Sequence, residues 1–174
     1  MTVYSVVSTS LPEGLVYTFL TLGVFITLRV LAFPDLTVDG SFVIGGSVAA
    51  VMIVAGYNPF LATIAAIAAG LACGAVTGLL NTKLKLPALL AGILMMIGLY
   101  SVNLRIMGGA NISLLREATI FENVAGFLGI AKSITLVVGV FAVLVFIVFM
   151  ILNWFLRTEI GLAMRATGDN EQMV

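Results

Sequence analysis

Five long apolar segments alternate with short polar ones along the chain. The apolar segments cover residues 15–31, 42–56, 61–80, 86–104 and 134–155. A helix needs about 20 apolar residues to cross a bilayer, and only the second segment is clearly short of that length. The pattern therefore predicts an all-α, polytopic membrane protein with about five transmembrane helices, in a single transmembrane domain that covers residues 1–174.

The polar stretch between the first two apolar segments is the most unusual feature of the pattern. Pro34 lacks a backbone donor and disfavours helix at the residue before it, so the first helix is expected to end there. Gly40 and the pair Gly45-Gly46 weaken helix on the other side. A short, glycine-interrupted membrane segment indicates a discontinuous helix at a transport site. The second transmembrane helix is therefore predicted to be discontinuous.

Two carboxylates, Asp35 and Asp39, lie in this stretch, although only 9% of the residues are charged. A carboxylate at bilayer depth is costly and persists where protein or a water-filled cavity shields it. An alternative is a polar turn at the membrane surface, in which Asp39 caps the second helix. If the stretch lies in the membrane, it predicts a substrate pathway formed by Thr37, Asp39, Gly40 and Ser41.

The third apolar segment is built from small residues. Gly70, Gly74 and Gly78 recur every four residues and form one smooth helix face, which predicts close packing against a neighbouring helix. The turn at 57–59 precedes this helix, with Pro59 near its start. A tight basic loop is expected at 81–85, before Pro87.

The basic residues indicate an orientation. With five spans, Lys83, Lys85 and the basic residues of the tail lie on one side together with Arg29, and the densest cluster is in the shortest loop. By the positive-inside rule, this side is cytoplasmic, and so is the C-terminus. The opposite side then holds 111–133, where the apolar stretch 124–130 is too short to cross and is expected to form a surface or re-entrant turn.

Composition excludes several classes of protein. Hydrophobic residues make up 61% of the chain, so a water-soluble domain is ruled out. Eight basic and eight acidic residues balance, which gives no reason to expect a nucleic-acid partner. Histidine is absent, which excludes a histidine-dependent metal site or triad, and the single cysteine, Cys73, is expected to be a packing residue. No basic residue precedes Arg29, so the first apolar segment is expected to be a retained helix rather than a signal peptide.

The polar tail has a pattern of its own. Gly168 can end a helix in the left-handed conformation, and Asp169 can cap a new one, with Gln172 three residues later. This pattern predicts a short helix that begins near Asn170, outside the bilayer. The alternative is a solvated, disordered end.

Two motifs resemble permeases of ABC importers of the branched-chain amino acid and ribose type. The segment 38–45 is similar to that family's Ile-Asp-Leu-Ser-Val-Gly, with Asp39 on the aspartate and Ser41 near the serine, and 36–42 looks most like the amino-acid branch. The tail resembles the family's cytoplasmic loop, Thr-x-x-Gly-x-x-x-x-Ala-x-Gly-x-Asn-Glu, which forms a coupling helix against the ATPase subunit. Matching positions in the tail are Thr158, Gly161, Ala166, Gly168, Asn170 and Glu171.

The resemblance implies a permease subunit of a binding-protein-dependent importer, for amino acids, in a bacterial plasma membrane. Its expected partners are an ABC ATPase subunit, an extracytoplasmic substrate-binding protein and a second permease subunit. No Gly-x-x-x-x-Gly-Lys-Ser/Thr loop occurs, so no cofactor is expected in this chain, and ATP hydrolysis is assigned to the partner rather than to an enzyme activity here. The residues implied in ATPase coupling are Gly161, Arg165, Gly168, Asp169, Asn170 and Glu171.

Family members usually continue for three or more further spans, so the resemblance implies that this chain is a truncated permease, a fragment or one piece of a split subunit. Four alternatives stay open at this point. They are a sugar or nucleoside permease of the same family, the substrate-capturing subunit of an energy-coupling-factor vitamin importer, a membrane protein or fragment without transport, and an intramembrane enzyme. The helix-packing glycines are equally consistent with a membrane protein without transport. An intramembrane enzyme is disfavoured by the lack of histidine.

Overall fold

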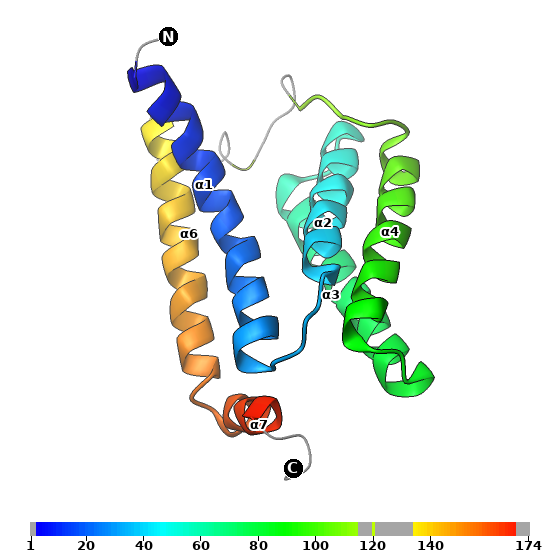
Figure 1. The fold of residues 1–174 in the computed structure, drawn as a ribbon. Coiled ribbons are helices and arrows are strands. Elements are labelled where there is room, and N and C mark those ends of the chain that lie inside the picture. The colour runs from blue at the N-terminus through cyan, green and yellow to red at the C-terminus, as the bar shows by residue number, and fades with distance from the viewer. Residues whose placement is uncertain (1–2, 115–119, 121–133, 170–174) are drawn as a thin grey trace. The chain divides into compact units, whose positions relative to one another are not determined.

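The computed structural model of the chain describes residues 3–114, 120 and 134–169 (Figure 1). All regular elements in this part of the chain are helical, and five helices are long and apolar enough to cross a membrane. The predicted all-α polytopic architecture is therefore confirmed. The described helices fall into two compact units, one with α1, η1, α6 and α7 and the other with α2, α3 and α4. The assignment of 1–174 to a single permease domain stays a prediction.

The first helix begins earlier and ends differently from the sequence-based expectation. α1 runs over Val3–Phe25, with Pro12 inside it, and continues into a π-helical turn, η1, over Ile26–Val30. The candidate span within it is Ser10–Val30. The turn ends with the backbone N–H of Leu31 donating to the carbonyl of Ile26 at 3.0 Å. Helix thus stops shortly before Pro34, as that proline predicts.

The second transmembrane helix is continuous, so the prediction of a discontinuous one was wrong. α2 covers Thr37–Val54 without interruption, and the irregular backbone lies before it, where Ala32 has a positive φ of 51°. The glycines inside α2 all keep helical geometry, and one of them is closely packed. This residue is Gly40, buried against α4.

The next two helices are longer than their apolar segments indicate. α3 covers Pro59–Leu84, with the side-chain oxygen of Asn58 accepting from the N–H of Phe60 at 2.9 Å, which confirms the turn before it. The expected loop at 81–85 is largely helical and ends at Lys85 in the left-handed conformation. α4 follows over Ala88–Met107 and ends at Gly108, which has a φ of 66°. Both helices continue for three or four residues beyond the ends of their apolar segments at 80 and 104, through polar residues.

α2 is the central element of its unit, since it packs against both α3 and α4. Its buried residues are mostly small or polar and follow one helical stripe: Thr37, Gly40, Ile44 and Ser47. Ile44, Cys73 and Leu99, one from each helix, form the buried core of this unit. Close packing of small residues is the usual means by which membrane helices associate, and it brings the backbone of α2 close to α4 at Gly40. Cys73 has the packing role expected of it.

In the other unit, α6 covers Ile134–Phe155 and lies beside α1, with both helices running in the same direction (Figure 1). None of the α6 residues is buried in this chain, which fits its Val, Phe and Ile composition and a lipid-facing position. α7 covers Glu159–Asp169 and crosses near the end of η1. A short helix thus follows the last span, but it covers the residues before Asn170, and the helix that was expected to begin near Asn170 lies outside the described residues. The segment 170–174, and the predicted surface turn at 124–130, lie outside the described residues.

Candidate substrate site

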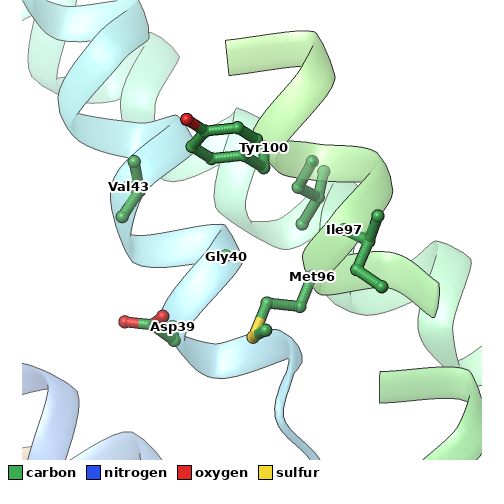
Figure 2. Close-up of a pocket in the computed structure, with 7 residues that line it drawn as sticks. Asp39, Gly40, Val43, Met96, Ile97 and Tyr100 are labelled. Atoms are coloured by element: carbon green, nitrogen blue, oxygen red, sulfur yellow. The ribbon is translucent and has the colours of Figure 1, made fainter. Parts of the chain in front are cut away.

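A cavity of about 260 Å³ lies between α2 and α4, in the first half of α2 (Figure 2). Its lining is mostly apolar and holds one carboxylate and one phenol ring. The lining residues are Asp39, Gly40, Val43, Met96, Ile97, Leu99 and Tyr100.

The helical register explains why these side chains meet. Asp39 and Val43 are four residues apart and share one face of α2, while Met96, Leu99 and Tyr100 are three to four residues apart on α4. Figure 2 shows the ring of Tyr100 reaching from α4 toward Val43, with Asp39 one helical turn away on α2. The ring of Tyr100 therefore lies near one end of the cavity, and Asp39 lies near the other.

Gly40 sets the distance between the two helices at the floor of the cavity. A Cβ at this position would lie 3.0 Å from Cδ1 of Leu99 and 3.4 Å from Cα of Met96. Such contacts are tighter than most, so an added side chain would have to displace the end of Leu99 by a few tenths of an ångström and would change the shape of the cavity. Of the residues predicted for the substrate pathway, Asp39 and Gly40 line this cavity.

Thr37 and Ser41, the other two predicted pathway residues, do not line it. Thr37 is 2% exposed, and its hydroxyl lies 3.0 Å from that of Thr77 on α3. The Ser41 hydroxyl donates to the carbonyl of Val38 at 3.0 Å, within its own helix. The Thr37 hydroxyl thus links α2 to α3, whereas the Ser41 hydroxyl bonds within α2. Neither residue lines the cavity.

Asp39 was also considered as the cap of the second helix, and that alternative was wrong. α2 starts at Thr37, and the carboxylate of Asp35 accepts from the N–H of Thr37 at 2.8 Å, so Asp35 satisfies the free donor at the helix start. Asp39 is the third residue of the helix, in its first turn and on its exposed side. The structure gives its carboxylate no hydrogen bond or ion pair with the residues described. Among the described residues, no group therefore competes with a ligand for this carboxylate.

The contribution of α4 to this cavity was missed by sequence reasoning. Met96, Ile97 and Tyr100 lie within a long apolar run, where nothing distinguishes a cavity wall from a lipid-facing surface. Tyr100 follows Ile97 by three positions and Met96 by four, so the three side chains lie on one face of the helix. That spacing is common in helices, and only the pairing with α2 gives it meaning.

The residues implied in ATPase coupling gather on α7, as far as the structure describes them. Gly161 packs under the turn between α6 and α7, where a Cβ would collide with the backbone of Phe155 and Leu156. Gly168 packs against the carbonyl of Val30, and it lies inside α7 rather than ending a helix, so its expected left-handed conformation was wrong. Arg165 is exposed on the same helix. The backbone of Asp169 ends α7, and Asn170 and Glu171 lie outside the described residues.

The glycine face of α3 has no neighbour in the described part of the chain. A Cβ at Gly70, Gly74 or Gly78 would have nothing within 4 Å. The helices α2 and α4 instead contact the adjacent face, which carries the buried side chains of Cys73 and Thr77. Packing of the glycine face against a helix outside this part of the chain stays a prediction.

The described residues hold no group of three or more acidic or cysteine side chains that could bind a metal ion. That cofactors are bound only by a partner subunit stays a prediction.

Comparison with known proteins extends the geometric description. Residues 6–174 match the family model described as the permease component of the branched-chain amino acid transport system. The chain is 40% identical over 162 residues to a protein of Clostridioides difficile named tyrosine transport system permease protein, and this match covers 93% of the chain and 52% of the relative. It is 35% identical over 170 residues to an uncharacterised protein of Rickettsia prowazekii, covering 98% of the chain and 57% of that relative.

The chain thus spans about half the length of these curated relatives. No solved structure matches it.

Proposed function

Because this chain belongs to the permease family of branched-chain amino acid transport systems, we propose that it contributes the first five spans of an amino-acid importer. In this proposal the protein lies in the bacterial plasma membrane with α7 on the cytoplasmic side. An extracytoplasmic binding protein delivers the substrate, and a separate ABC ATPase subunit supplies the energy. The basic residues Lys83, Lys85, Arg157 and Arg165 support this orientation, since they share one side of the membrane in a five-span topology.

The cavity between α2 and α4 is the observation that carries the proposal. It offers one carboxylate in an otherwise apolar lining with an aromatic ring, and about 260 Å³ of space. A zwitterionic amino acid with a large apolar or aromatic side chain matches that chemistry. Its ammonium group would pair with Asp39, and its side chain would contact Met96 and the ring of Tyr100. The relative named as a tyrosine transport permease supports an aromatic amino acid as the substrate.

Coupling to the ATPase is proposed for the surface of α7. Ile160 and Leu162 are 65% and 54% exposed on this helix, so apolar side chains are available for a partner. Gly161 and Gly168 allow α7 to pack tightly against the ends of α6 and η1. A force applied to α7 is therefore transmitted to the first and last spans of this unit. A second permease subunit, facing the open glycine surface of α3, completes the proposed assembly.

Uptake of radiolabelled tyrosine tests the proposed role of the cavity. The assay uses a full-length permease that contains this segment, with its binding protein and ATPase, and is normalised to membrane-inserted permease. Asp39→Asn removes the charge and keeps the shape, and it is expected to lower uptake about 10- to 100-fold, the worth of one charge-assisted hydrogen bond. Asp35→Asn is the matched control, because asparagine caps a helix nearly as well as aspartate.

Competition with unlabelled compounds tests the substrate class. Phenylalanine and tryptophan should compete with tyrosine more strongly than alanine, and ribose should not compete. Wild-type uptake by the Asp39→Asn variant would remove this carboxylate from the pathway. Competition by ribose alone would replace the amino-acid assignment by a sugar.

A further inference from the structure

A second cavity, of about 330 Å³, lies in the unit formed by α1, η1, α6 and α7. Two arginines line it, Arg29 from η1 and Arg165 from α7, beside the apolar side chains of Phe25 and Val30. These residues come from segments more than 130 positions apart in the sequence. The cavity therefore exists only because α7 folds back against the end of the first span.

The position of α7 against η1 is set by close backbone contact. Gly168 lies so near the carbonyl of Val30 that a Cβ would collide with it, and Leu31 packs on the same glycine. Arg165 is three residues before Gly168, about one helical turn away, and Arg29 precedes Val30. The same contact that docks α7 thus brings the two guanidinium groups to one cavity.

The charge at this cavity is not balanced by the described residues. Neither Arg29 nor Arg165 makes a hydrogen bond or ion pair with the part of the chain that the structure describes, and no acidic side chain is among the described lining residues. The carbonyl end of α1 and η1 offsets part of the charge, because a helix C-terminus carries roughly half a negative charge. One arginine is enough to complement that dipole. With both guanidinium groups present, the described lining keeps a net positive charge.

The cavity lies at the end of the first candidate span. The first candidate span ends at Val30, so Arg29 is in the last turn of a membrane-crossing helix. α6 runs beside α1 in the same direction, and Trp154, near its end, is 70% exposed. Exposed tryptophan at the end of a span is typical of the interface where lipid headgroups lie. A first span that ends at Val30 would place Arg29 near the level of the lipid phosphate groups.

We propose that this cavity is a binding site for a phosphate-bearing anion, supplied by an anionic membrane lipid such as phosphatidylglycerol. Guanidinium groups suit phosphate because their planar donors form paired hydrogen bonds with its oxygens. Phe25 is 46% exposed beside them, and an apolar neighbour suits the glycerol and acyl part of a lipid better than a free anion. A bound lipid would bridge η1 and α7, and so hold α7 against the end of the first span.

Native mass spectrometry of the full chain tests this proposal. The protein is reconstituted in phosphatidylcholine vesicles with and without phosphatidylglycerol, extracted, and examined for retained lipid. Arg29→Gln and Arg165→Gln should each weaken phosphatidylglycerol retention about fivefold, the usual effect of one basic residue at an anionic membrane surface. Arg157→Gln is the matched control, since Arg157 is exposed near α7 but does not line the cavity. Circular dichroism checks that all variants keep their helices.

A second arm separates lipid from free anion, using inorganic phosphate in vesicles of phosphatidylcholine alone. Retention of phosphatidylglycerol that depends on both arginines and resists phosphate supports the lipid site. Phosphate binding that depends on both arginines, without lipid preference, supports the anion site and overturns the lipid as its source. Equal retention by all variants would overturn the proposal. It would also be overturned if Arg29→Gln and Arg165→Gln weakened only the binding of an ATPase partner.

Discussion

The hydroxyl oxygens of Thr37 and Thr77 lie 3.0 Å apart and join α2 to α3, and both residues are only 2% exposed. Thr77 is also 3.1 Å from the carbonyl oxygen of Cys73, one turn earlier on its own helix. A carbonyl can only accept, so all three groups are satisfied when Thr77 donates to Cys73 and Thr37 donates to Thr77. The pair thus connects the start of α2 to the second half of α3 by a buried polar contact.

Removing one hydroxyl of this pair should be mildly destabilising. Interhelical hydrogen bonds in membrane proteins contribute about 0.6 kcal/mol on average, so we expect about that coupling from Thr37→Val, Thr77→Val and the double variant. The measurement is the free energy of unfolding in mixed micelles, analysed as a double-mutant cycle. Thr63→Val is the control, because the Thr63 hydroxyl bonds only the carbonyl of Pro59 in its own helix. Additive effects of the two substitutions would show that the hydroxyls do not interact.

The hydrogen bond from the N–H of Thr37 to the carboxylate of Asp35, one residue before the N-cap Leu36, gives a second prediction. Asp35→Ala removes the acceptor for the N–H of Thr37 and should lower stability by about 0.5–2 kcal/mol, whereas Asp35→Asn should be nearly neutral. Asp39→Ala should cost no more than the modest interaction of a first-turn carboxylate with the helix dipole, about 0.3–1 kcal/mol. The free energies of unfolding of the three variants show which of the two carboxylates stabilises the start of α2. A larger loss for Asp39→Ala than for Asp35→Ala would return the capping role to Asp39.

Gly92 is predicted to be the least replaceable glycine of α4. A Cβ here would lie 2.7 Å from the backbone nitrogen of Leu36 and 3.1 Å from the carboxylate of Asp35. Because backbone cannot move aside as a flexible side chain does, Gly92→Ala should destabilise the unit by about 1–3 kcal/mol.

Gly98→Ala provides the comparison for Gly92→Ala, since a Cβ at Gly98 would have nothing within 4 Å. That variant should be neutral or up to about 1 kcal/mol more stable, as alanine favours helix over glycine. Both are measured by thermal or denaturant unfolding of the purified chain. Equal stability of the two variants would contradict the close packing of α4 against the start of α2.

The docking of α7 gives a fourth prediction. Gly168→Ala should displace α7 from η1, because the added methyl group would collide with the carbonyl of Val30. A disulfide cross-link between cysteines placed at Leu31 and Thr167, in a chain with Cys73→Ala, should form readily while Gly168 is kept and be lost when Gly168→Ala is added. Gly139→Ala on α6, where nothing lies within 4 Å, should leave the cross-link unchanged. Persistence of the cross-link in the Gly168→Ala variant would show that α7 tolerates the methyl group.

The local pattern alone determined the membrane class, the number of spans and most turns. Apolar runs of sufficient length form helices in a bilayer whatever surrounds them, because their backbone groups have no other partners. Pro34 ended the first helix, and Asn58 with Pro59 began the third, through chemistry confined to neighbouring residues. The two motifs that resemble the permease family were likewise local, and the match over residues 6–174 confirmed that resemblance.

Only the tertiary structure decided which residues share a cavity and which glycines carry close contacts. Gly40 and Gly92 are pressed against neighbouring segments, whereas Gly70, Gly74 and Gly78 form the more regular pattern and have no neighbour within 4 Å. Likewise, the carboxylate that accepts from the first N–H of α2 is that of Asp35 rather than Asp39, because the helix begins two residues before Asp39, within the polar stretch. These outcomes depend on the register and separation of helices distant in sequence, where shifts smaller than one atom decide whether a contact forms. The hydropathy and spacing of residues along the sequence do not determine the distance between such helices.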